Sequence, residues 1–203
     1  MLGAVILKEL STLPRDGTEV PELSRAATYL RNCRSFDQFC STLRGLIDPV
    51  EFCPFCEVEM VRSRRKKLAE SGGWALVENH FPHSSTKEML LIVPRRHVLS
   101  PHELRPEDWR DIGLLFDFGT GYPDRPGGGL FLRFGDPNYH AGSVNHLHFN
   151  IIFPILGEEY RPPFTKSEAE RASDHSRLLC HVDELTKYGG ASWLFSDEAI
   201  RRA

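Results

Sequence analysis

The chain of 203 residues lacks long apolar runs. None approaches the roughly 18 consecutive apolar residues that cross a bilayer, so we expect no membrane partner. The apolar start Met1–Leu7 is short and has no basic segment before it, which is unlike a signal peptide. The five cysteines are an odd number, whereas secreted disulfide frameworks have an even number in a shorter chain. The sequence therefore predicts a cytoplasmic protein, and its cysteines favour a metal site over disulfides.

An excess of positive charge is also absent. The 25 basic and 28 acidic residues give a net charge of −3 with neutral histidines. This excludes a globally cationic nucleic-acid binder but still allows a local basic patch. The segment Arg62–Lys67 holds five of the basic residues. It reads either as the solvated face of a helix that Gly72-Gly73 breaks, or as a contact with phosphate or RNA.

The spacing of apolar residues predicts a mixed fold. Their share of 40% is enough for a core. We expect strands at Trp74–Glu78, Glu88–Val93, Leu130–Phe134 and His146–Phe153, and helices after Ser35, over Pro106–Phe118 and over Ser167–Tyr188. Strands gathered in the middle of the chain indicate the α+β class. The predicted domains are a helical N-terminal extension (1–49), a core (50–156) and a helical C-terminal extension that packs on the core (157–203).

The stretch His140–Pro154, HAGSVNHLHFNIIFP, is the most informative part of the chain. Because the strand period is two, His146, His148 and Asn150 would project from one face. A hydrogen-bonded polar face would explain the three residues alone. The preceding Gly142-Ser143 turn favours a functional site instead, since it can offer a hydroxyl and backbone N–H groups to a phosphate.

Three motifs together resemble the histidine triad (HIT) superfamily of nucleotide hydrolases and transferases. They are Gly-Ser-Val-x-His-x-His-x-Asn at 142–150, the segment Glu78–His97 with its Pro-Arg-Arg-His end, and Cys-Pro-Phe-Cys at 53–56. The resemblance covers roughly residues 50–156. It implies a HIT-like antiparallel sheet, flanked here by helices and by helical extensions at both ends.

The resemblance also implies roles for individual residues. His148 corresponds to the nucleophile that forms a nucleotidyl-histidine, and Ser143 to the hydroxyl that assists the leaving group. Asn79 falls where the family holds the ribose, and Phe81 lies near the base pocket. Gly142 and Ser143 would bind the nucleotide phosphate together with His148. Asn150 occupies the third triad position, where its amide can stabilise phosphate charge but cannot carry a proton, as in the transferase branch with Gln there.

Cys53 and Cys56 alone are compatible with a metal site or with two buried thiols. Zinc requires four ligands, commonly sulfur and nitrogen. The resemblance supplies His97 and His146 as the other two. It therefore implies a structural zinc ion beside the proposed nucleophile.

We expect a nucleotide hydrolase or nucleotidyltransferase that cleaves a nucleoside 5′-phosphoanhydride or phosphoramidate through a nucleotidyl-histidine. The alternative is a catalytically idle HIT-fold nucleotide-binding or scaffold protein, which Asn150 and Gly135 favour. An enzyme acting on nucleic-acid ends is a further reading, but the net negative charge argues against it. By analogy with the family we expect a homodimer whose other partner is the nucleotide substrate.

Overall fold

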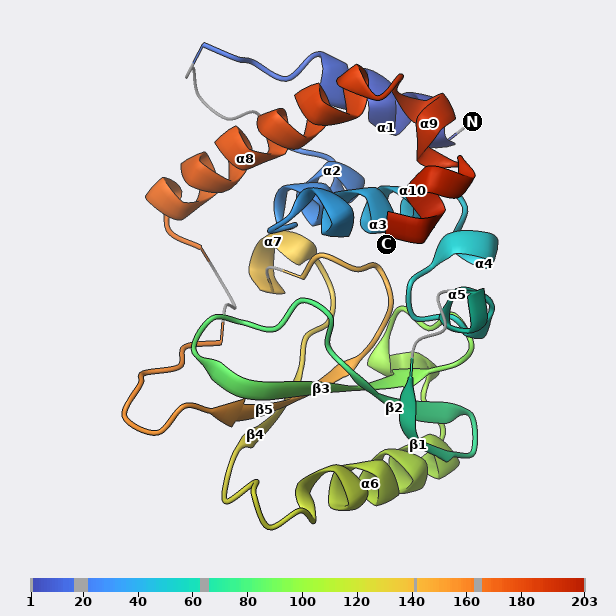
Figure 1. Ribbon diagram of the computed structural model, residues 1–203, viewed down its shortest axis with the longest axis vertical. Coiled ribbons are helices and arrows are strands. Elements are labelled where there is room, and N and C mark those ends of the chain that lie inside the picture. Colours follow the sequence, from blue (N-terminus) through green and yellow to red (C-terminus); the bar gives the residue numbers. More distant parts are fainter. Residues whose placement is uncertain (1, 17–21, 63–65, 141, 163–165, 203) are drawn as a thin grey trace. The chain divides into compact units, whose positions relative to one another are not determined.

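The computed structural model describes residues 2–16, 22–62, 66–140, 142–162 and 166–202 (Figure 1). The chain forms two compact units. The sheet unit comprises Phe55–Gly135 and His146–Pro162, and the helical unit comprises Met1–Pro54, Asp136–Asn145 and Pro163–Ala203. The segment 136–145, which lies within the range 50–156 of the predicted core, is part of the helical unit.

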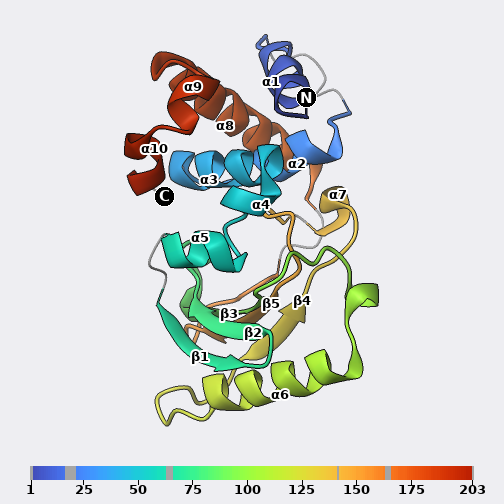
Figure 2. The same ribbon diagram turned by 90° about the vertical axis from the view of Figure 1, so that its right-hand side faces the viewer.

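The sheet unit is built on a five-stranded antiparallel sheet with the order β1-β2-β3-β5-β4. Helix α6 lies along it (Figure 2). Alternate strand residues such as Trp74, Leu90 and Ile151 pack with Ile112 and Leu115 of α6 in one apolar core. The elements are α5 (Glu57–Arg62), β1 (Lys67–Ser71), β2 (Trp74–Glu78), β3 (Thr86–Pro94), the 3₁₀ helix η1 (Pro101–Glu103), α6 (Pro106–Thr120), β4 (Gly129–Leu132) and β5 (Phe149–Pro154).

The helical unit has a core of its own. Phe39 and Leu43 of α3 are fully buried there, and Leu178, Val182 and Leu185 of α8 recur at helical spacing. Its helices are α1 (Leu2–Ser11), α2 (Arg25–Arg31), α3 (Phe36–Ile47), α4 (Pro49–Phe52), α7 (Pro137–His140), α8 (Glu168–Lys187), α9 (Ala191–Leu194) and α10 (Asp197–Arg202). Within the described residues, no helix is long and apolar enough to span a membrane.

Side-chain caps start two predicted helices of the helical unit. Ser35 accepts a hydrogen bond from the Gln38 backbone at the start of α3, and Ser167 forms a capping box with Glu170 at the start of α8. The Ser35-x-x-Gln38 spacing also predicts a reciprocal bond from the Gln38 side chain to Ser35, and this prediction is wrong. Gln38 Oε1 accepts the Arg34 N–H at 2.8 Å instead.

The predicted α+β class with an antiparallel sheet is confirmed, but β1 was missed. We expected a helix before Gly72-Gly73, whereas Lys67–Ser71 forms a hairpin with β2. Gly72 makes the tight turn possible: its φ is +51°, and a Cβ there would lie 2.0 Å from Asp111 Oδ2.

Residues 63–65 of the basic run lie outside the described residues. At its ends, Arg62 pairs with Glu59, and Lys67 pairs with Glu57 and Glu70.

The last predicted strand begins later than expected. β5 starts at Phe149, so His146 and His148 lie in the segment just before it. The backbone of this segment bonds to a residue beyond the end of β3: the Leu147 N–H donates to the Val98 carbonyl at 2.7 Å. The turn-rich segment 136–142 also contains a short helix, α7.

Candidate functional site

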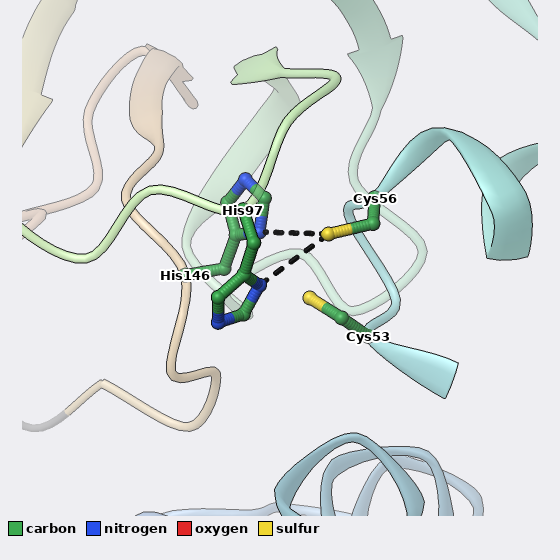
Figure 3. Close-up of side chains that lie close together, drawn as sticks. All are labelled: Cys53, Cys56, His97 and His146. Atoms are coloured by element: carbon green, nitrogen blue, oxygen red, sulfur yellow. Dashed lines mark hydrogen bonds between the residues drawn. The ribbon is translucent and has the colours of Figure 1, made fainter. Parts of the chain in front are cut away.

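Two cysteines and two histidines form a cluster that could hold a metal ion (Figure 3). The ligand atoms of Cys53, Cys56, His97 and His146 all lie within 4.8 Å of one another. Cys56 Sγ is 3.3 Å from His97 Nδ1 and 3.6 Å from His146 Nδ1. In a tetrahedral zinc site with bonds of about 2.0–2.3 Å, neighbouring ligand atoms lie about 3.3–3.8 Å apart. The two spacings from Cys56 and the donor set therefore fit zinc.

Local structure gathers the four ligands from separate parts of the sequence. Cys53 follows α4 and is joined to Cys56 by only two residues, so the chain itself brings the thiols together. His97 follows β3, and His146 precedes β5. Cys53, Cys56 and His146 are buried, and His97 is partly exposed. A buried donor set of this kind excludes water from competing for the ligands.

The ring of His146 is oriented for metal binding. Its Nε2 lies 3.1 Å from the carbonyl oxygen of Pro94, which can only accept, so Nε2 carries the proton. The lone pair is then on Nδ1, which faces Cys56 Sγ. Burial lowers the pKa of His146 below its ordinary value, against the opposing influence of Cys56. The ring is therefore held in the neutral form that a metal requires.

The imidazole of His148 is fixed by the backbone. Its Nδ1 lies 2.8 Å from the carbonyl oxygen of His146 and must donate to it. In the neutral ring this leaves the lone pair on Nε2. Phe55 packs edge-on against His148, with ring centroids 4.9 Å apart, and also against His146 at 5.8 Å. His148 is buried, so both its tautomer and its ring plane are constrained.

Asn150 is a buried amide without a hydrogen-bond partner. It lies in β5, opposite Leu91 of β3 and Phe131 of β4. Only 2% of the residue is exposed, and neither Oδ1 nor Nδ2 has a partner among the described residues. Leaving a buried amide unsatisfied costs about 1–3 kcal/mol. Both atoms are therefore available to a polar ligand or a water molecule.

The turn Gly142-Ser143 belongs to the helical unit, where α3 holds it. Gln38 Nε2 donates to Ser143 Oγ at 2.8 Å, and Thr42 Oγ1 donates to the Ser143 carbonyl at 2.9 Å. The Gly142 N–H donates to His140 Nδ1 at 3.0 Å. This N–H therefore already has an acceptor in the structure, and the expected phosphate contact of the turn stays a prediction.

Asn79 and Phe81 form a local turn at the end of β2. The Phe81 N–H donates to Asn79 Oδ1 at 2.9 Å, and Asn79 Nδ2 lies 3.1 Å from Met89 Sδ. The second lone pair of Oδ1 is still able to accept a hydrogen bond. The expected ribose contact of Asn79 and base contact of Phe81 stay predictions.

Sequence reasoning missed Gln38 and Thr42 as residues that hold the Ser143 turn. They lie 105 and 101 positions from Ser143 along the chain. Spacing patterns report only local neighbours, so no signal in a single sequence links these positions. Phe55 had a visible signal, since it stands inside the Cys-x-x-Cys motif, but its contact with His148 depends on tertiary structure.

Comparisons with known proteins gave structural neighbours only, because no family model and no curated protein matches the chain. A hypothetical protein from Leishmania major is 22% identical, with 65% of this chain and 96% of that chain covered and a TM-score of 0.41. A zinc-bound histidine triad family protein from Mycobacterium smegmatis is 14% identical, with the same coverage and TM-score. The diadenosine triphosphate hydrolase of Plasmodium falciparum is 15% identical, with coverage of 62% and 95% and a TM-score of 0.38. Sequence identities and TM-scores at this level assign no activity to this chain.

Proposed function

We propose that the protein is a nucleotide hydrolase or nucleotidyltransferase that uses His148 as its nucleophile. Its substrate is a nucleoside 5′-phosphoanhydride or phosphoramidate, such as a dinucleoside polyphosphate. Nε2 of His148 attacks the α-phosphorus and forms an N–P bond while the bond to the leaving group breaks. Water or a second acceptor then cleaves the N–P bond and releases the nucleotide.

The observation that carries the proposal is the hydrogen bond from His148 Nδ1 to the His146 carbonyl, 2.8 Å long. A neutral imidazole attacks through its unprotonated nitrogen, and this bond selects Nε2 for that purpose. Because the acceptor is the backbone of a proposed metal ligand, metal binding would also fix the position of the nucleophile. Zinc in this role is structural, held by Cys53, Cys56, His97 and His146.

Ser143 suits the role of proton donor to the leaving group. Its Oγ accepts a hydrogen bond from Gln38 Nε2, so the hydroxyl proton is directed elsewhere and can be donated. General-acid assistance of this kind is typically worth ~10²–10⁴-fold in rate. Asn150, with its unsatisfied amide, would donate to a non-bridging phosphate oxygen.

A catalytically idle nucleotide-binding protein is the second candidate. Asn150 favours it, because an amide in the third position of the motif cannot transfer a proton. Both candidates predict nucleotide binding, and only the enzyme predicts turnover that depends on His148. The expected homodimer and cytoplasmic location stay predictions under either candidate.

Turnover with defined substrates separates the two candidates. Wild-type protein and the variant His148→Ala are incubated with a nucleoside phosphoramidate, dinucleoside polyphosphates and adenylated DNA, and products are separated by chromatography. We expect cleavage of at least one of the first two by wild type and none by His148→Ala, with nucleotide binding retained. His102→Ala, which changes an exposed histidine, is the matched control. Nucleotide binding without any turnover would favour the idle protein.

A further inference from the structure

Four charged side chains meet within the helical unit, at residues that the proposed reaction does not use. Arg31 ends α2, and Lys166 directly precedes Ser167, the N-cap of α8. Asp174 and Arg177 lie on α8. One oxygen of Asp174 accepts from Lys166 Nζ and the other from Arg177. The Arg177 Nε also donates to the Cys33 carbonyl at 3.0 Å. Two cations therefore share a single carboxylate in these contacts, and Asp174 forms no ion pair with Arg31 among them.

Arg31 is the least compensated of the three cations. Only 6% of the residue is exposed, and among the described residues its Nε has no hydrogen-bond partner. Its NH2 group donates to Asn138 Oδ1 at 3.1 Å, which is a neutral acceptor. Burial lowers the pKa of Arg31, Asp174 acts against this, and the charge of Arg171 acts in the same direction as burial.

Lys166 experiences the same excess of positive charge. Burial lowers the pKa of Lys166 despite its bond to Asp174, and the charges of Arg177 and Arg31 lower it further. Asp136 does not pair directly with Arg31 to offset this positive charge. The Asn138 amide lies between them, and its Nδ2 donates to Asp136 Oδ1 at 3.1 Å. Buried charge without a counter-charge is costly, so the cluster favours an incoming anion.

The chemistry of the cluster fits a phosphate group. The unpartnered Nε of Arg31 can donate to a phosphate oxygen, and guanidinium groups match phosphate geometry. Arg177 and Lys166, which already donate within the cluster, add positive charge. Arg31, Lys166 and Arg177 outnumber Asp174, the one carboxylate that contacts Lys166 and Arg177, and a phosphate group would add negative charge. Asn32 connects the cluster to the Ser143 turn: its Oδ1 accepts from Lys166 Nζ at 2.9 Å, and its Nδ2 donates to the Gly142 carbonyl at 2.9 Å.

We propose that Arg31, Lys166 and Arg177 form a phosphate-binding site in the helical unit. The site takes a phosphate group, either as the free ion or as part of a phosphate chain. The proposal does not depend on His148 being a nucleophile, since every contact that supports it lies within the helical unit. An occupied site would hold α2, α7 and α8 together and, through Asn32, support the turn that carries Ser143.

Titration calorimetry of the full chain with inorganic phosphate and with inorganic tripolyphosphate, at constant ionic strength in chloride, tests the site. We expect saturable binding of at least one probe by wild type. Arg31→Gln and Lys166→Gln should each raise its dissociation constant at least about tenfold, the scale of losing one charge-assisted hydrogen bond. Binding of phosphate itself indicates a site for the free ion, and binding of tripolyphosphate alone indicates a site for a chain; both results support the proposal.

Arg15→Gln is the matched control. Arg15 also pairs with a carboxylate of α8, Asp183, but both side chains are about half exposed. The dissociation constant should not change in this variant, and circular dichroism checks that each variant is folded. If Arg31→Gln does not fold, Lys166→Gln decides the question, because Lys166 is less deeply buried. No binding by wild type at millimolar probe, or equal binding by wild type and the folded variants, would overturn the proposal.

Discussion

His148 donates a hydrogen bond through Nδ1 to the backbone carbonyl of His146, and the two atoms are 2.8 Å apart. The ring of His146 meanwhile points its Nδ1 at Cys56 and its Nε2 at Pro94. One residue thus serves two sites: its ring faces the metal cluster, and its carbonyl sets the tautomer of His148. Displacement of His146 in the metal cluster should therefore also displace the imidazole of His148, the candidate nucleophile.

The first prediction concerns the metal. Purified protein should hold about one zinc ion per chain, and Cys56→Ser should lose most of it because Cys56 contacts both histidines. The free energy of unfolding should fall by several kcal/mol, since binding of a structural metal is coupled to folding. Elemental analysis by mass spectrometry and chemical denaturation measure the two effects.

Cys180→Ser is the control for the metal prediction, because Cys180 is an exposed free cysteine outside the cluster. It should leave zinc content and stability unchanged. Wild-type protein that is folded but binds no zinc on titration would contradict the assignment of the four ligands.

The second prediction concerns Gln38. In Gln38→Glu a carboxylate replaces the amide donor, so the Ser143 hydroxyl would donate to it instead of to the leaving group. We expect kcat to fall at least ~10-fold, within the range that general-acid assistance contributes. Gln38→Met, which offers no acceptor of comparable strength, should lose less. Steady-state kinetics with the preferred substrate measure both variants.

The effects of Gln38→Glu and Ser143→Ala should not add. If Gln38 acts through Ser143, the double variant is no slower than Ser143→Ala alone. Independent, multiplicative losses would instead show that Gln38 influences the reaction by another route, or that Ser143 is not the proton donor.

The sequence predicted the local features of the fold better than the distant contacts. The cap at Ser35, the helix predicted over Ser167–Tyr188 and the strand Trp74–Glu78 follow from local chemistry, and all three are present. Strand β1 was missed because Lys67–Ser71 contains few apolar residues and is paired along one edge only. The support of Ser143 by Gln38 depends on a contact across 105 positions, which no periodicity reveals.

The third prediction separates stability from activity at Asn150. Asn150→Leu replaces an unsatisfied buried amide with an apolar group of similar size, so the free energy of unfolding should rise by about 1–3 kcal/mol. Turnover should fall by ~10²–10³, the scale of losing one donor to a charged transition state. Thermal or chemical unfolding measures the change in stability, and single-turnover kinetics measure the change in turnover. A variant that is destabilised and fully active would contradict both parts.

The fourth prediction concerns Asp108 and pH. Burial alone would raise the pKa of Asp108, but hydrogen bonds from the Arg105 backbone and the Trp74 indole, with the charge of Arg96, hold it below its ordinary value. A carboxyl group with a lowered pKa stabilises the fold above its unfolded pKa of about 3.9, and this stabilisation is lost as pH falls through the folded pKa. Wild type should therefore lose stability steeply below about pH 4.

In Asp108→Asn the loss of stability below about pH 4 should be smaller than in wild type. At neutral pH its free energy of unfolding should be lower by about 1–3 kcal/mol. Asp117→Asn, which removes an exposed carboxylate from the same helix, is the comparison. The prediction is checked by denaturant unfolding at a series of pH values. It is wrong if wild type and Asp108→Asn show parallel curves down to acid pH.

The fifth prediction and most direct test is the mass of the protein after a rapid denaturant quench during turnover. The account predicts a population heavier by one nucleoside monophosphate, with the modification mapped by peptide fragmentation to His148 and absent in His148→Ala. Quenching conditions are kept alkaline for one aliquot, because N–P bonds hydrolyse in acid. Turnover with no such adduct, or full turnover by His148→Ala, would contradict the assignment of His148 as the nucleophile.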